Sequence, residues 1–93
     1  MECRNNYCWV YIDREKGADN PLYIRYAETF SQVLQESGGH ELLYFEQFDS
    51  LDEGLAHKQL LNKLSNRILQ HTISYYNPAF RDLHEDFLLC RHF

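Results

Sequence analysis

The chain has 93 residues, a formal net charge of −5 and an ordinary apolar content. This length is enough for a core without staples, so we expect a single domain over residues 1–93. No stretch approaches the roughly 20 apolar residues that a membrane helix needs, and the N-terminus lacks the basic and apolar parts of a secretory signal. The three cysteines have no metal-type spacing, which is typical of reduced thiols and favours a cytoplasmic protein.

The negative charge is concentrated in the middle of the chain. Residues 1–26 and 51–93 each carry equal numbers of acidic and basic side chains, whereas residues 27–50 carry five carboxylates and no Lys or Arg. Sequence-independent DNA binding depends on Lys and Arg that neutralise phosphates, so carboxylates facing DNA would repel it. The other interpretation of this block is a solvated acidic face far from any ligand.

Two apolar segments near the N-terminus predict the centre of a β-sheet. Residues 7–12 and 22–26 are rich in aromatic and β-branched side chains, and a polar connection joins them. Both faces of the first segment are apolar, which predicts a central strand covered on two sides. In an antiparallel pair, Tyr11 would lie near Tyr23 on one face, and Arg25 shares that face with Tyr23.

Helix signals and one more strand follow. Thr29 and Gln32 resemble a capping box for a helix that ends at the Gly38-Gly39 pair, and residues 40–48 alternate as a third strand. Further signals are a capping box at Ser50 and Glu53, a helix cap at Ser65-Asn66, a turn at Asn77-Pro78 and a last helix over residues 81–89. We expect residues 90–93 to be frayed. The expected apolar stripe of the helix after Ser50 contains Leu51, Leu55, Leu61, Leu64 and, if that helix continues, Ile68.

A paired tyrosine motif carries a resemblance to a known family. Trp9-Val10-Tyr11 is followed, after a short loop, by Tyr23-Ile24-Arg25. Three later segments continue in order, at residues 43–46, 53–64 and 77–83. Together these segments resemble the GIY-YIG endonucleases, in particular their small single-domain branch, over nearly the whole chain. The resemblance implies an α+β fold, with a three-stranded antiparallel sheet in the order 2-1-3 and three to four flanking helices.

The resemblance also implies a set of catalytic positions. Family-type cleavage is metal-assisted phosphodiester hydrolysis, with two tyrosines, an arginine on the scissile phosphate and a glutamate that holds Mg²⁺ or Mn²⁺. Tyr11 and Tyr23 match the two tyrosines. The arginine position falls on Val33, or on Gln32 if the alignment slides by one residue, and the glutamate position falls on Lys58. Neither Val33 nor Gln32 can clamp a phosphate by charge, and an ammonium group cannot ligate a divalent cation.

Three other residues are candidates within this pattern. Arg25 stands where the family motif has glycine, and it could supply a guanidinium to a phosphate from the sheet. The alternative is a solvent-exposed or ion-paired arginine. Glu53 lies near Lys58, but its place in a capping box disfavours it as a metal ligand. Asn77 is a candidate binding residue in the late family-like segment. The five histidines are scattered, and the sequence shows no Ser-His-Asp arrangement.

We therefore expect a catalytically degenerate GIY-YIG-like domain, without nuclease activity or cofactor, that acts as a binding module for a protein partner. The first alternative is a divergent endonuclease that uses Mg²⁺ or Mn²⁺. The second alternative is a domain that binds nucleic acid without cutting it, through Arg25, Lys58, Lys63 and Arg67. Metal-dependent cleavage would identify the first alternative, and salt-sensitive DNA binding would identify the second.

Overall fold

The computed structural model describes residues 8–17 and 19–89. Tyr7 and the tail at residues 90–93, for which we expected fraying, lie outside the described residues. The elements are β1 (Cys8–Arg14), β2 (Tyr23–Ala27), α1 (Phe30–Glu36), β3 (Glu41–Phe48), α2 (Leu51–Asn62), α3 (Asn66–Tyr76) and α4 (His84–Leu89). The strands form one antiparallel sheet in the order β2-β1-β3, which confirms the predicted α+β fold and strand order.

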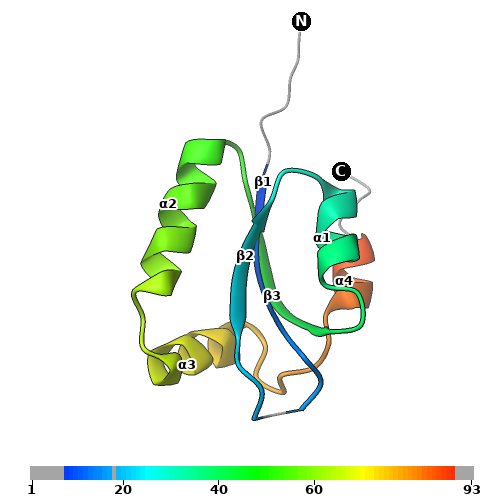
Figure 1. Ribbon diagram of the computed structural model, residues 1–93, viewed down its shortest axis with the longest axis vertical. Coiled ribbons are helices and arrows are strands. Elements are labelled where there is room, and N and C mark those ends of the chain that lie inside the picture. Colours follow the sequence, from blue (N-terminus) through cyan, green and yellow to red (C-terminus); the bar gives the residue numbers. More distant parts are fainter. Residues whose placement is uncertain (1–7, 18, 90–93) are drawn as a thin grey trace, which may run out of the picture.

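The sheet lies between two helical layers. Alternation along β1 sends Val10 and Ile12 to one face, where they pack with Leu61, Leu69 and other side chains of α2 and α3. Trp9 and Tyr11 go to the other face, where α1 and α4 cover them. Figure 1 shows α2 and α3 on one side of the sheet and α1 and α4 on the other. All of β1 is buried, as its two apolar faces predicted.

The strand register brings the family-like positions together on one face. Tyr11 pairs with Arg25 and Asp13 pairs with Tyr23, so these four residues share the face that α1 covers. On the other side of β1, the pairing with β3 shifts between Ile12 and Asp13. This irregularity is a β-bulge, which changes the local twist at the end of the central strand.

The predicted caps are confirmed. The side chains of Thr29, Ser50 and Ser65 each accept a hydrogen bond from a main-chain N–H in the first turn of the helix that they precede. Each cap satisfies one of the N–H groups that a helix leaves without an internal partner. Thus the starts of α1, α2 and α3 follow from local sequence alone.

The predicted apolar stripe of α2 is partly wrong. Leu61 is buried, but Leu55 is 39% exposed, whereas Gly54 is buried. α2 approaches β1 at Gly54, and this close approach turns Leu55 toward solvent. Ile68 belongs to α3, whose new start at Ser65 resets the helical phase.

The last helix begins at His84, three residues later than predicted. The residues before it are held along β3, because Leu83 N–H donates to the Leu42 carbonyl at 2.7 Å. Asp82 accepts from Leu42 N–H at 3.1 Å and from His84 N–H at 3.2 Å. Because these bonds hold residues 82 and 83 against the edge of the sheet, the helix begins only at His84.

No helix in the described part of the chain combines the length and apolar character needed to cross a membrane.

Candidate functional site

The hydroxyl of Tyr11, the first tyrosine of the motif, is hydrogen-bonded to a carboxylate. The Tyr11 side chain is completely buried on the central strand, and its hydroxyl donates a hydrogen bond to Oε1 of Glu36 at the end of α1. The other Glu36 oxygen accepts from Gln32 Nε2 at 3.0 Å. Burial, followed by the bond to Glu36, raises the pKa of Tyr11 above its ordinary value. A phenol that stays protonated and donates to a carboxylate is a poor general base for water.

Glu36 also shows how the acidic block relates to this face. It is one of the five carboxylates of residues 27–50, and it contacts Tyr11 directly. Hydrogen bonds from Tyr11 and then Gln32 lower the pKa of Glu36, so it is ionised at neutral pH. A negative charge therefore lies directly beside the Tyr11 hydroxyl.

Asp13 is the centre of a second hydrogen-bonded group on the same face of the sheet as Tyr11. This carboxylate is fully buried, and it accepts from Arg25 Nε at 2.7 Å and lies 2.7 Å from His40 Nδ1. The Arg25 guanidinium lies 5.0 Å from the centre of the Tyr23 ring, and that ring stacks on His40 with 6.3 Å between centroids. Arg25 is thus ion-paired, the alternative stated from the sequence, and its side chain is 33% exposed.

Asp13, Glu36 and His40 belong to this site but were not predicted from the sequence. Asp13 was expected in the connection after the first strand, whereas β1 extends to Arg14. The available signal was the alternation of Trp9, Tyr11 and Asp13, which continues one face by two more residues. No comparable local signal identifies Glu36 or His40, because tertiary packing brings both to the sheet.

Of the two positions that the resemblance aligns with the family's arginine and glutamate, the arginine position lies in the same core cluster as Tyr11, whereas the glutamate position lies on the other side of the sheet. Val33 is fully buried in the core between α1 and the sheet. Gln32 is bonded to Glu36 and accepts from Glu28 N–H at 3.2 Å. Lys58 belongs to α2, which packs on the opposite face of the sheet.

The residues present do not fit a family-type divalent metal site. Asp13 is occupied by Arg25 and His40, and Glu36 is occupied by Tyr11 and Gln32. Mg²⁺ requires open carboxylate and water oxygens in near-octahedral geometry. Among the described residues, no group of three or more His, Cys, Asp or Glu side chains is placed to hold a metal ion.

Asn77 holds the backbone of the turn before α4. It is buried, and its Nδ2 donates to the Leu43 carbonyl at 3.2 Å and to the Arg81 carbonyl at 2.8 Å. Its Oδ1 accepts from Arg81 N–H at 3.2 Å. Both amide hydrogens are used within the fold, so a ligand that took one would break a link between this turn and β3.

The expectation that there is no Ser-His-Asp arrangement is wrong, because tertiary packing brings Ser37, at the end of α1, to His84, at the start of α4. Ser37 Oγ lies 2.9 Å from His84 Nε2, and His84 Nδ1 lies 2.6 Å from Asp82 Oδ1. This is the connectivity of a hydrolytic triad, but a nucleophile must also reach its substrate. Ser37 is completely buried, and its hydroxyl lies 2.7 Å from the Val33 carbonyl, to which it donates. We interpret the group as a structural clamp between the two helices.

The hydrogen bonds of Asp82 in this clamp predict that the free energy of unfolding depends on pH. Burial opposes ionisation of Asp82, but hydrogen bonds from Leu42 and His84 and the His84 ring outweigh it, so its pKa lies below the usual 3.8. The ionised Asp82 carboxylate therefore contributes its full stabilisation of the fold above pH 3.8. This contribution is lost as the pH falls through the lower pKa that Asp82 has in the folded protein.

Asp82→Asn should lower the free energy of unfolding by about 0.5–1 kcal/mol near neutral pH, a value reduced by solvent screening. The side chain of Asp82 is 44% exposed, which is why the effect stays small. Urea unfolding at a series of pH values should show that the difference from wild type shrinks as the pH falls below 3.8. A difference that stays constant across the acid range would contradict this role.

Comparisons of the chain with models of protein families, with curated proteins and with solved structures found no match, so the GIY-YIG resemblance stays a prediction from its motifs.

Proposed function

We propose that this chain is a GIY-YIG-like domain without nuclease activity that acts as a protein-interaction module. The observation that supports this most strongly is the Tyr11–Glu36 hydrogen bond. In metal-assisted hydrolysis, a tyrosine that activates water needs an open position next to it and a cation that stabilises developing charge. Here the phenol is buried and bonded, and its neighbour is an anion.

The Asp13 group supports the same proposal from the other side of the site. Arg25 lies directly opposite Tyr11 in the sheet, and its guanidinium is paired with the buried carboxylate of Asp13. For Arg25 to bind a phosphate, Asp13 would have to remain buried with less compensation of its charge. The loss of that pairing opposes the use of Arg25 as a phosphate clamp.

The candidate nucleic-acid-binding side chains are divided between the two faces of the sheet. Arg25 lies on the face covered by α1, whereas Lys58 belongs to α2 on the opposite face. An electrostatic footprint for DNA is a continuous basic patch or stripe. The distribution therefore favours a protein partner over nucleic acid.

A nuclease assay tests the proposal. Purified protein is incubated with branched and duplex DNA in Mg²⁺ or Mn²⁺, and Tyr11→Phe is compared with Tyr26→Phe. Tyr26 is the matched control, because its hydroxyl donates to Glu28 at 2.9 Å and it pairs with Val10, on the sheet face away from Tyr11. We expect no metal-dependent cleavage by any of the three proteins.

Stability provides the second readout of these variants. Tyr11→Phe should lower the free energy of unfolding by about 1 kcal/mol, because it removes a buried donor to an ionised acceptor. Tyr26→Phe should cost less than about 0.5 kcal/mol, as is usual for an exposed contact. Metal-dependent cleavage that Tyr11→Phe abolishes and Tyr26→Phe keeps would overturn the proposed function.

A further inference from the structure

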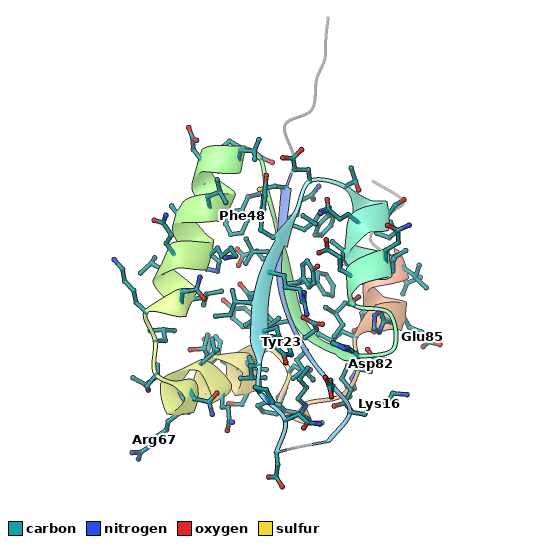
Figure 2. The ribbon with its side chains drawn as sticks, in the orientation of Figure 1. Lys16, Tyr23, Phe48, Arg67, Asp82 and Glu85 are labelled. Atoms are coloured by element: carbon teal, nitrogen blue, oxygen red, sulfur yellow. The ribbon has the colours of Figure 1, made fainter. Side chains whose placement is uncertain are left out.

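Strand β3 forms one edge of the sheet, and within the described part of the chain its outer side is bonded to another segment only near its start. The outer side of Leu42 and Leu43 is bonded to the segment of residues 77–83, through Leu83 N–H, the Asp82 carboxylate and Asn77 Nδ2. Figure 2 shows Asp82 between the start of β3 and α4, with Phe48 toward the opposite end of the strand. The cover therefore stops near the middle of β3.

The second part of β3 presents an open edge. Within residues 8–17 and 19–89, β1 is the one element with main-chain hydrogen bonds to residues 44–48. Edge strands with unpaired N–H and C=O groups are templates for an added strand, and proteins usually cover them. Here residues 77–83 cover part of the edge, and no other segment of residues 8–17 and 19–89 makes main-chain hydrogen bonds to the outer side of the rest.

A cavity lies against this open edge. Its volume is about 600 Å³, and three segments line it: the middle of β3, the turn after α3 and the beginning of α4. Tyr76, which is 63% exposed, stands on its rim and packs on Tyr44 with 5.4 Å between ring centroids. The full lining is Tyr44, Phe45, Glu46, Tyr76, Asn77, Pro78, Ala79, Arg81, Leu83 and Asp86.

The charge around the open edge is negative. Glu46 and Asp49 lie on or just after the open part of β3, and residues 44–49 contain no Lys or Arg. At the cavity, Arg81 pairs with Asp86 at 2.9 Å, so its charge is compensated within the rim. The side chain of Glu46 is 44% exposed, and it accepts from the Tyr44 hydroxyl. A partner segment that pairs here would be favoured by Lys or Arg side chains.

We propose that residues 44–48 of β3 bind an extended, basic segment of a partner protein as an added strand, with one of its side chains in the adjacent cavity. Main-chain hydrogen bonds supply affinity in this mode of recognition, and a pocket for alternate side chains supplies specificity. This inference rests on the proposed interaction function and names where the partner binds and what its chemistry is.

Direct binding of a designed peptide tests the inference. The probe is a short fluorescent peptide in which lysine alternates with valine, and its affinity for the full chain is measured by fluorescence anisotropy at low and moderate salt. Two control peptides replace lysine by glutamate, or methylate the main-chain nitrogens on one edge. We expect binding of the first peptide to weaken with salt, and we expect neither control to bind.

Variants of the chain locate the site. Tyr76→Ala should weaken binding about tenfold, as expected for an aromatic side chain at the rim of a binding pocket. Tyr75→Ala is the matched control, because Tyr75 is 84% exposed and does not line the cavity. Ala79→Trp should weaken binding by filling the cavity. A Tyr75→Ala effect as large as that of Tyr76→Ala would place the peptide elsewhere and overturn the inference.

Hydrogen exchange separates strand addition from a contact of side chains alone. On peptide binding, amide protons of residues 44–48 that point away from β1 should become slow to exchange, while those of β2 stay unchanged. Binding without this protection, equal binding of the glutamate peptide, or pairing of two copies of the chain through β3 would each overturn the inference. None of these results produces the metal-dependent cleavage that would overturn the proposed function, so the two failures are distinguishable.

Discussion

Replacing Asp13 with alanine should lower the free energy of unfolding by about 3 kcal/mol, because it removes a buried acceptor shared by two side chains. Asp13 is fully buried, whereas the side chains of Arg25 and His40 are 33% and 25% exposed. Partial access to water lets these two groups regain some solvation, which keeps the cost below that of a fully buried ion pair. Urea unfolding at neutral pH measures the effect.

The exposed ion pair between Arg81 and Asp86 supplies the control. Arg81→Ala removes an ion pair whose side chains are 60% and 42% exposed, and it should cost less than about 1 kcal/mol. If Asp13→Ala were as mild as Arg81→Ala, the Asp13 group would not be the electrostatic centre of this face. The Arg25 guanidinium would then be available for other partners.

Replacing Gly54 with alanine should lower the free energy of unfolding by about 2 kcal/mol, although alanine is the better helix former. A β-carbon at Gly54 would lie 2.2 Å from Cys8 Sγ, and Cys8 is completely buried. Overpacking of this kind costs about 3 kcal/mol, and the gain in helix propensity returns about 1 kcal/mol. Urea unfolding of the single variant measures the net loss.

A double-mutant cycle identifies the cause. Cys8→Ala removes the sulfur atom that the new methyl group would strike, so Gly54→Ala should be neutral or stabilising in the Cys8→Ala background. An equal cost of Gly54→Ala in both backgrounds would contradict a steric clash with Cys8 as the cause of the destabilisation.

The sheet and the helix starts could be predicted because they depend on local patterns. Alternation with two apolar faces identified β1 as the central strand, and side-chain caps at Thr29, Ser50 and Ser65 identified where three helices begin. The buried face of α2 could not be predicted in the same way. A leucine pattern indicated Leu55, but the close approach at Gly54 depends on which strand residue lies beneath the helix.

The site could be predicted in part. The shared face of Tyr11, Tyr23 and Arg25 follows from strand alternation, and the register confirms it. The partners that decide what these side chains can do come from elsewhere: Glu36 is 25 positions from Tyr11, and His40 is 27 positions from Asp13. No local spacing encodes such pairs, so their effect on the tyrosine and the guanidinium required the packed fold.

We propose that the face of the sheet that carries Tyr11 does not hold a divalent cation, because Asp13 and Glu36 are bonded to side chains of the same chain. Paramagnetic Mn²⁺ tests this directly, since it broadens NMR signals of nuclei close to its binding site. Titrating Mn²⁺ into protein with ¹³C-labelled tyrosine should leave the Tyr11 signal as sharp as that of Tyr26. Selective broadening of Tyr11 at low Mn²⁺, reversed by an excess of Mg²⁺, would contradict the account.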